Sequence, residues 1–319
     1  MNRHRTALSV LLATGALLAG ALTAASPSAA EPRPASQGLW SAERMRAATP
    51  LDITAAPGAI ARTAPTTTEH ATRIAPTPAS ASPTASLKAS PAAFPQPGGA
   101  WTSGGAVVKT SGRVFFTFNG KSASCSGDSI TSANGSTVIT AGHCVKYQGA
   151  WHTNWIFVPG YDNGNAPYGQ WTATKTFATD QWVASEDMNM DVGLAVVAPL
   201  NGRTLSQTVG AQGIVFNGGY NKKMYAFGFP AAAPYDGSKL VYCSGNSGKD
   251  FLLTKDHSLP CNMTGGSSGG PWFQDFNEAT GLGTQVSVNS FGYTFLPNRM
   301  FGPYFGNEAK AAYDKAQTA

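Results

Sequence analysis

Three short strings in the sequence carry side chains that can perform nucleophilic catalysis. They are TAGHC at residues 140–144, DVGLA at 191–195 and TGGSSGGP at 264–271. A serine hydroxyl is a weak nucleophile until a base within about 3 Å takes its proton. Imidazole suits that task because its reference pKa is about 6.5, and a buried carboxylate on its second nitrogen fixes the tautomer. His143, Asp191 and Ser268 are therefore the candidates for base, orienting acid and nucleophile.

Each candidate has rivals of the same residue type. These are His152 and His257 for the base, Asp180 and Asp187 for the acid, and Ser267 for the nucleophile. Only His143 lies in a TAGHC string, and only Asp191 directly precedes an apolar run. A loop rich in glycine and serine usually has no catalytic role. The presence of all three strings, in the order His, Asp, Ser, nevertheless favours a catalytic triad.

A second kind of serine hydrolase also fits part of the pattern. Residues 266–270 satisfy Gly-x-Ser-x-Gly, the nucleophile elbow of α/β-hydrolases, in which the acid and then the histidine follow the serine. No histidine follows Ser268, because the last one in the chain is His257. The elbow interpretation is therefore excluded.

The strings resemble the hallmark sequences of the trypsin-like (chymotrypsin-fold) serine peptidases, Ala-Gly-His-Cys and Gly-x-Ser-Gly-Gly-Pro. The region that carries them is also similar to secreted bacterial enzymes of the glutamyl-endopeptidase type. The resemblance implies a serine endopeptidase that hydrolyses peptide bonds through an acyl-enzyme on Ser268. It further implies an oxyanion hole made by the backbone N–H groups of Gly266 and Ser268, a protein or peptide substrate, and no cofactor.

The strand pattern predicts an all-β fold. Many short apolar runs alternate with turn signals, for example residues 113–118 before Asn119-Gly120, a hairpin signal. The one strong helical stretch is residues 308–316, with Asn307 as a possible cap. Two antiparallel six-stranded β-barrels with a C-terminal helix are what the resemblance implies. It places His143 and Asp191 in the first barrel, Ser268 in the second, and the site in the cleft between them.

Substrate-binding positions also follow from the resemblance. Asn262 falls at the base of the primary pocket, six residues before Ser268, and Ser290-Phe291-Gly292 matches the wall segment that pairs with an extended peptide. The neutral Asn262 argues against a pocket for arginine or lysine. Glutamyl enzymes place a histidine near this wall, which neither Asn289 nor Ser290 supplies, so glutamate preference is not predicted. Ordinary strand and turn packing explains these positions equally well.

The N-terminus has the features of an export signal. Arg3 and Arg5 precede an apolar run over residues 7–25, and small residues follow at 28–30. An uncleaved anchor is the alternative, but the run is near the lower spanning limit of about 17 residues and contains glycines. We expect residues 1–30 to be a signal peptide. The mature protein would then be secreted and extracellular, without stable membrane insertion.

Residues 31–98 differ in composition from the rest. The first 99 residues hold 12 of the 21 prolines but only two of the 33 aromatic residues, Trp40 and Phe94. A Pro/Ala/Thr/Ser segment buries too little surface to offset its ordering entropy. We therefore predict a low-complexity pro-segment or linker with little fixed structure, followed by a peptidase domain over 99–319.

The residue before the proposed nucleophile indicates how a precursor would be activated. Animal enzymes of the family carry aspartate there, which pairs with a newly cut N-terminus, whereas this chain has Ser267. We infer a zymogen that is activated without such an ion pair. Removing residues 31–98, called the leader below, would either unblock the cleft or trim a flexible arm.

The distribution of charge argues against nucleic acid as a partner. Residues 1–99 hold 8 Lys/Arg and 4 Asp/Glu, a net charge of +4. The remaining residues 100–319, the body of the protein, hold 14 Lys/Arg and 13 Asp/Glu, a net charge of +1, so most of the total of +5 lies in the first 99 residues. Without a basic cluster, the body is not expected to bind nucleic acid, and we expect a monomer.

Four cysteines downstream of an export signal indicate two disulfides, and three pairings are possible. The resemblance favours Cys125–Cys144, which leaves Cys243–Cys261. The spacing lacks the close cysteine pairs of a zinc site, so no metal is expected.

Two functions of other kinds compete with catalysis. One is a catalytically silent binding protein on a peptidase fold, since a fold does not determine function. The other is a cell-wall-associated protein tethered by the proline-rich arm. Silent relatives usually lack one residue of the triad, whereas all three candidates are present here.

Overall fold

The computed structural model describes residue 1, residues 40–55 and 63–80, and residues 92–319. The expected signal peptide therefore lies outside the described residues, apart from Met1. The fold reported below belongs to the compact unit Ser36–Ala319. No helix in the described ranges is long and apolar enough to span a bilayer.

The first half of the molecule is a closed barrel. Its sheet has the order β1-β6-β5-β10-β11-β12-β7, and an additional β6–β7 pairing closes six of these strands into a ring. The strands are β1 (Thr49–Pro50), β5 (Ser111–Phe118), β6 (Lys121–Ile130), β7 (Thr137–Thr140), β10 (Thr153–Pro159), β11 (Trp171–Ala178) and β12 (Gly193–Val197). The expected hairpin is confirmed, because β5 and β6 pair antiparallel across Asn119 and Gly120, both with positive φ. β1 alone runs parallel to its neighbour, β6.

The second half consists of two sheets. One has the order β3-β13-β19-β18-β14-β15-β4 and the other β16-β17-β21-β20-β2. The strands are β3 (Thr72–Ile74), β4 (Gln96–Ala100), β13 (Gly213–Phe216), β14 (Lys223–Gly228), β15 (Val241–Asn246), β16 (Gly248–Lys249), β17 (His257–Pro260), β18 (Pro271–Asn277), β19 (Leu282–Val288), β20 (Phe291–Tyr293), β21 (Leu296–Gly302) and β2 (Ile53–Ala55). The all-β class is confirmed. Among the described strands, however, no pairing joins the two sheets into a second six-stranded barrel.

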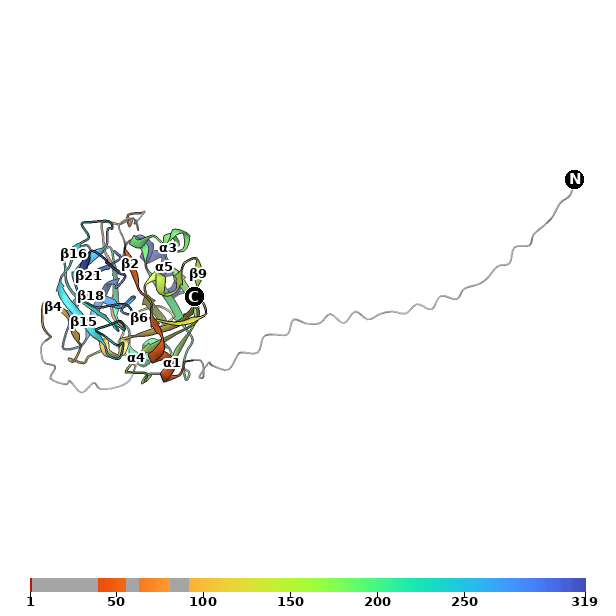
Figure 1. The fold of residues 1–319 in the computed structure, drawn as a ribbon, viewed down its shortest axis with the longest axis horizontal. Helices are drawn as coiled ribbons and strands as arrows, with labels where there is room; N and C mark the ends of the chain where they lie inside the picture. Colours follow the sequence, from red (N-terminus) through yellow and green to blue (C-terminus); the bar gives the residue numbers. More distant parts are fainter. Residues whose placement is uncertain (2–39, 56–62, 81–91) are drawn as a thin grey trace. The chain divides into compact units, whose positions relative to one another are not determined.

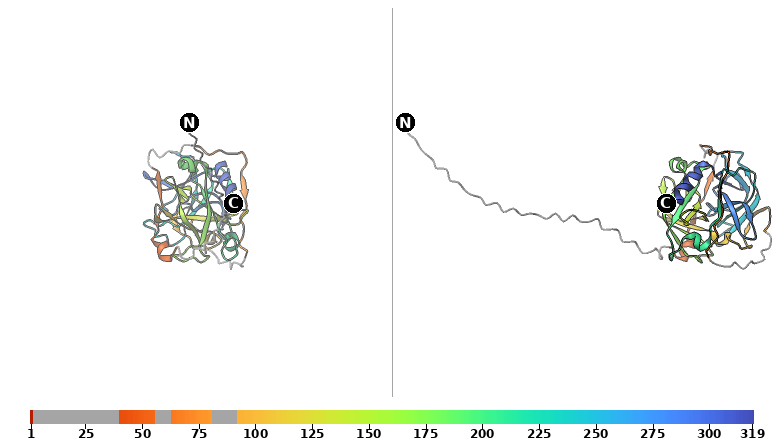
Figure 2. Two further views of the ribbon diagram at one scale, coloured as in Figure 1. Left: turned by 90° about the vertical axis from the view of Figure 1, so that its right-hand side faces the viewer. Right: turned by 180° about the vertical axis from the view of Figure 1, so that it is seen from behind.

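Short helical segments join and cover the sheets. They are α1 (Ala42–Ala47), α2 (Val107–Thr110), η1 (Gly142–Cys144), α3 (Asp180–Ser185), η2 (Met188–Met190), α4 (Leu205–Val209) and the terminal α5 (Asn307–Gln317), with the small β8 (Lys146–Tyr147) and β9 (Ala150–Trp151). The expected C-terminal helix is confirmed. It lies on the barrel side of the molecule, against β12 (Figure 2). Asn307 does not cap this helix. Its side-chain NH₂ donates to Thr66 Oγ1, and its side-chain carbonyl oxygen accepts a hydrogen bond from Asn217.

The leader has more fixed structure than its composition predicts. Trp40, Met45 and Ile53 are buried in the core, and β1 to β4 all pair with strands of the body. Strand pairing uses backbone groups, which every residue except proline supplies in full, so a segment poor in large side chains can still add strands to exposed edges. Figure 1 shows β2 between the cyan and blue strands of the second half and the barrel.

Two disulfides link neighbouring elements. Cys125–Cys144 joins β6 to η1 with an S–S distance of 2.01 Å, and Cys243–Cys261 lies in the second half with 2.04 Å. These pairs match the expected pairing. The sequence separations are 19 and 18 residues. Loops of this size stabilise the fold by about 3 kcal/mol each in the chain-entropy description.

A buried carboxyl on β6 leads to a prediction about stability and pH. Asp128 is fully buried and accepts a hydrogen bond from Ser111 Oγ at 3.0 Å, and its Oδ2 is buried without a geometrically good hydrogen bond from the described residues. Burial raises its pKa to about 8, and hydrogen bonds from Ser111 and Thr110 offset part of that rise. Because the pKa is about 3.9 when unfolded, the folded chain holds a proton between these values that the unfolded chain has lost. This group's contribution to stability therefore falls as pH rises from about 4 to about 8.

Asp128→Asn is expected to remove that dependence, since an amide resembles the protonated acid and does not ionise. The free energy of unfolding of the variant minus that of the parent should grow by about 1.4 kcal/mol per pH unit between pH 5 and 7.5. Urea unfolding of both proteins in a Ser268→Ala background, which prevents self-digestion, measures this difference. Parallel stability curves would contradict a protonated Asp128.

Candidate active site

The barrel brings His143 and Asp191 into contact. His143 lies in η1 just after β7, Asp191 lies just before β12, and these two strands pair with Thr140 opposite Gly193. Asp191 Oδ2 lies 2.8 Å from His143 Nδ1, and Oδ1 accepts the backbone N–H of His143 at 2.7 Å. Both side chains are fully buried. Two bonds from one carboxylate therefore fix both the backbone and the ring of the histidine.

A third donor reaches the same carboxylate from the second half of the molecule. Ser290, which directly precedes β20, donates its hydroxyl to Asp191 Oδ2 at 2.5 Å. The resemblance indicated Ser290 as a pocket-wall residue, whereas its side chain faces the acid. Its neighbour in the matched segment, Phe291, stacks on Phe301 with ring centroids 5.2 Å apart. No local sequence signal indicates the Ser290–Asp191 bond, because 99 residues separate the two; the resemblance singled out Ser290 only as part of the wall segment.

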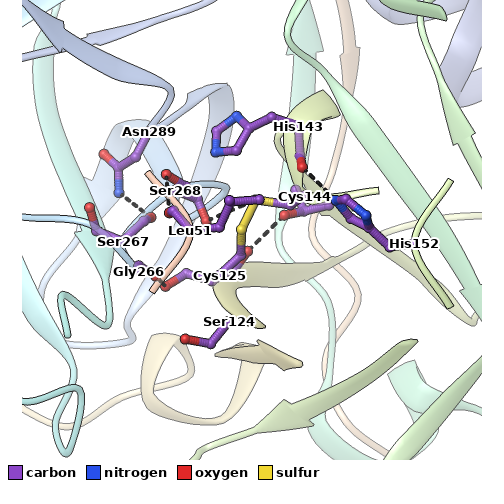
Figure 3. Close-up of a disulfide and its surroundings, with 12 residues drawn as sticks. Leu51, Ser124, Cys125, His143, Cys144, His152, Gly266, Ser267, Ser268 and Asn289 are labelled. Atoms are coloured by element: carbon purple, nitrogen blue, oxygen red, sulfur yellow. Dashed lines mark hydrogen bonds between the residues drawn. A yellow bond between two sulfur atoms is a disulfide. The ribbon is translucent and has the colours of Figure 1, made fainter. Parts of the chain in front are cut away.

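Another histidine supports His143 from behind. His152 Nε2 lies 2.8 Å from the carbonyl oxygen of His143, so this nitrogen is the donor (Figure 3). Burial lowers the pKa of His152 to about 4, with a smaller lowering by the charge of His143. His152 is therefore neutral at physiological pH and acts as a hydrogen-bonded support.

The rival residues have other partners. Asp180 pairs with Lys315 at 2.9 Å on the surface, and Asp187 accepts backbone N–H groups from Thr63 and Asn189. His257 is buried in β17, stacked near Tyr304. None of the three contacts Asp191 through a hydrogen bond in the described part of the chain.

Ser268 lies in the loop that leads into β18. Its backbone is joined to the barrel, because Ser126 N–H donates to the carbonyl oxygen of Ser268 at 2.7 Å and Cys144 Sγ lies 3.7 Å from the same oxygen. Its hydroxyl donates to the carbonyl oxygen of Leu51 at 3.5 Å. The rival Ser267 is buried and donates its hydroxyl to Thr264 at 2.8 Å. The loop thus presents Ser268, and not Ser267, toward Leu51 (Figure 3).

His143 and the Ser268 loop both lie against the Cys125–Cys144 disulfide. A ring nitrogen of His143 lies within 4.8 Å of both sulfurs of the Cys125–Cys144 disulfide, and one of those sulfurs contacts Ser268. His143 Nε2 is buried and has no hydrogen-bond partner among the described residues. The structure therefore gathers the three candidates in one place. The hydroxyl of Ser268 is bonded to Leu51 in this state rather than to the imidazole.

Gly266 occupies a backbone conformation that suits glycine. Its φ is +93°, and an added Cβ would lie 3.0 Å from Ala231 Cβ and 3.1 Å from the carbonyl oxygen of Phe229. Its N–H donates to the Leu51 carbonyl oxygen at 3.4 Å, and its own carbonyl accepts from Ser126 Oγ at 2.8 Å. The N–H is thereby aimed at a carbonyl that also contacts Ser268.

Gly266→Ala is expected to lower kcat at least 10²-fold, because the strained and crowded backbone would shift this N–H. Losing one oxyanion donor commonly costs 10²–10³-fold. Gly219→Ala is the matched control, since Gly219 also has positive φ, +77°, but has nothing within 4 Å of its added Cβ. Steady-state kinetics of both variants, freed of the leader, make the comparison. Equal losses would mean that backbone strain alone is responsible.

The remaining predicted substrate residue, Asn262, is covered by the leader. Its Oδ1 accepts from the hydroxyl of Tyr235 at 2.6 Å, and its N–H donates to the carbonyl oxygen of Pro97 at 2.7 Å. An added Cβ on Gly98 would lie 1.8 Å from the same Oδ1, so Gly98 lies directly on the amide. Gly292 is more accessible and pairs through its backbone with residue 54 of β2.

One group of side chains in the described ranges lies close enough to suggest a metal. It consists of Cys125, His143 and Cys144. Both sulfurs belong to a disulfide, so neither is available as a thiolate ligand. This group is therefore the disulfide beside the histidine and not a metal site.

Comparison with known proteins places this site in a family. A scan of protein-family models found no match. Among solved structures, protease Anisep from Arthrobacter nicotinovorans is 44% identical, with a TM-score of 0.63, over 67% of this chain and 98% of that one. A thermostable serine protease, AL20, from an extremophilic microorganism is 42% identical, also with a TM-score of 0.63, over 67% of this chain and 99% of the other.

Two more distant matches add less. A Glu endopeptidase is 16% identical with a TM-score of 0.56 over 70% of this chain and 97% of its own, which shows a shared fold alone. A curated protein described as an extracellular metalloprotease of Bacillus subtilis (strain 168) is 38% identical over 61 residues. That match spans 20% of the Bacillus protein and 19% of this chain. On the identity and nearly full coverage of the two proteases, the chain belongs to the trypsin-like, chymotrypsin-fold serine peptidases, a family of serine endopeptidases.

Proposed function

We propose that the chain is a secreted serine endopeptidase that hydrolyses peptide bonds through an acyl-enzyme on Ser268. His143 is the general base and Asp191 the orienting acid. The observation that carries this proposal is the buried bond between Asp191 and His143 Nδ1, with Nε2 of the same ring left without a hydrogen-bond partner among the described residues.

The chemistry follows from these positions. With the ring proton on Nδ1 held by Asp191, Nε2 has the lone pair that accepts the hydroxyl proton as Ser268 Oγ attacks a carbonyl carbon. The bonds from His143 N–H and Ser290 Oγ keep the carboxylate in place while the ring becomes positive. Negative charge on the carbonyl oxygen is stabilised by the N–H of Gly266 and by that of Ser268. His143 then returns the proton to the leaving amine, and water repeats the sequence on the ester.

The proposal extends to substrate and location. The edge of β20 is paired with a segment of the chain itself, β2, which supports extended peptide segments of proteins as substrates. Two disulfides fit an oxidising compartment. The extracellular description of the matched Bacillus protein also supports secretion. We expect a monomer without nucleic acid, stable membrane insertion or a cofactor.

A peptide library tests the function directly. The leader is first removed by limited proteolysis, and the cleaved enzyme is incubated with the library before analysis by mass spectrometry. New peptide termini that disappear after pretreatment with a sulfonyl fluoride would support the proposal and report the preferred side chain. An intact library would contradict it.

Activity is expected to rise with pH between about 6 and 8, because a general base must be unprotonated before it can accept the serine proton and works best when it changes charge near the operating pH. Two other buried histidines, His152 and His257, do not contribute to this pH dependence. Burial lowers the pKa of His152 to about 4 and that of His257 to about 3, so neither changes charge in that range. The dependence of kcat/KM on pH measures the rise, and a flat profile through this range would contradict His143 as the base.

A further inference from the structure

We propose that residues 49–55 of the leader are a built-in inhibitor that occupies the active site in a form the enzyme hydrolyses poorly. This proposal rests on the proposed function, since it concerns regulation of the same site. Of the two roles considered for removal of residues 31–98, unblocking the cleft or trimming a flexible arm, we therefore propose the first.

The carbonyl oxygen of Leu51 occupies one of the two proposed oxyanion donors, the N–H of Gly266, together with the hydroxyl of the proposed nucleophile. It accepts the N–H of Gly266 at 3.4 Å and the hydroxyl of Ser268 at 3.5 Å. The N–H of Leu51 in turn donates to the carbonyl oxygen of Ser124 on β6 at 2.9 Å. A substrate carbonyl cannot enter while Leu51 holds both of these donors (Figure 3).

Strands on both sides of Leu51 hold it in place. Before it, β1 pairs in parallel with β6, with Thr49 opposite Ala123 and Pro50 opposite Ser124. After it, β2 pairs in parallel with β20, with Ile53 opposite Phe291. The side chain of Ile53 is 5% exposed and belongs to the main core. The segment thus crosses from one half of the molecule to the other, covering the backbone edge at which an extended substrate would pair.

An anchor upstream adds to this hold. Trp40 is buried against Phe115, with ring centroids 5.4 Å apart, and its indole N–H donates to the carbonyl oxygen of Asn154 at 2.9 Å. Met45 of α1 is 1% exposed in the same cluster. Closer to the site, the backbone approach is tight, since a Cβ added to Gly265 would lie 2.9 Å from Asp52 Cβ. Apolar burial at the anchor therefore offsets part of the cost of ordering residues 49–55.

Two features explain why Leu51–Asp52 resists hydrolysis. First, Ser268 donates its hydroxyl to the Leu51 carbonyl oxygen, while His143 Nε2 has no hydrogen-bond partner in the described chain, so nucleophile and base are uncoupled. Second, cleavage would leave both new ends bound, residues 49–50 on β6 and residues 53–55 on β20. The amine would remain next to the acyl group, and reforming the bond would compete with attack by water.

The test compares the intact full chain with enzyme from which the leader has been removed by limited proteolysis after folding. The measured quantity is the rate of labelling by a fluorophosphonate, with the intact mass checked at each time point. We expect labelling of the full chain to be at least 100-fold slower than that of the cleaved enzyme. Ile53→Asp in the full chain should speed labelling at least 10-fold without cleavage. Glu43→Ala, an exposed change in α1, should behave as the parent.

A second measurement keeps the proposal testable if Ile53→Asp does not fold. A synthetic peptide of residues 40–55 should inhibit the cleaved enzyme and remain uncut at Leu51–Asp52 over hours, and the same peptide with Ile53→Asp should bind at least 10-fold more weakly. Equal labelling of full-length and cleaved forms, or rapid cutting of the peptide at Leu51–Asp52, would overturn the inhibitor. Absence of labelling in both forms would overturn the proposed function and this proposal together.

Discussion

Replacing Ser268 with alanine is expected to lower kcat of the cleaved enzyme by about 10⁶, the loss known for the nucleophile of such triads. The methyl group cannot form the acyl-enzyme, so His143 and Asp191 lose their function in the same step. The fold should be unaffected, because the only described bond of this hydroxyl is the long one to the Leu51 carbonyl. Initial rates with a peptide ester and a peptide amide measure the loss.

Ser185→Ala is the matched control for this change. Ser185 lies at the surface end of α3, where its hydroxyl bonds the carbonyl oxygen of Gln181 within the same helix. Its replacement should change kcat less than twofold. If Ser268→Ala lost only a few-fold in kcat, the nucleophile would have to be another residue.

Asp191→Asn is expected to lower kcat by about 10⁴ near neutral pH. The carboxylate accepts three hydrogen bonds, from the backbone and ring of His143 and from Ser290 Oγ. An amide offers only one acceptor oxygen, and its NH₂ group would face a donor. Turning that NH₂ toward the ring would place the ring proton on Nε2, where it blocks acceptance of the serine proton.

The rival acid supplies the control. Asp180 is on the surface and pairs with Lys315, and surface pairs contribute about 0–1 kcal/mol to stability. Asp180→Asn should therefore leave kcat within twofold of the parent. Circular dichroism and melting of both variants separate a catalytic loss from unfolding. Full activity of Asp191→Asn would exclude this residue as the orienting acid.

The residues of the candidate site could be selected from sequence because each of them lies in a short string. The chemistry requires a fixed local backbone around the histidine and the serine, and that backbone needs particular neighbours such as Gly266 with φ of +93°. The β5–β6 hairpin was predictable for the same reason, since Asn119 and Gly120 adopt the positive φ that the turn requires.

The contacts of Ser290 and Leu51 could not be predicted in this way. Ser290 meets Asp191 across 99 residues, and Leu51 meets Ser268 across 217. Nothing local in either segment encodes its distant partner. Composition predicted little fixed structure in the leader, whereas its described parts form strands. The addition of strands depends on backbone groups and on a few buried side chains, such as Trp40 and Ile53, which composition does not weigh. The division of the second half into two sheets, rather than one closed barrel, depends on strand register and bulges, such as the shift between Trp272 and Phe273, which hydrophobic patterning does not reveal.

The most direct test of the account is to map where an organophosphonate attaches to the cleaved enzyme. Tryptic peptides of the labelled protein are sequenced by mass spectrometry, with and without prior denaturation. We expect a single adduct on Ser268, absent from the denatured protein and slowed by Asp191→Asn. A chain that stays unlabelled, or an adduct on Ser267 or any other residue, would contradict it.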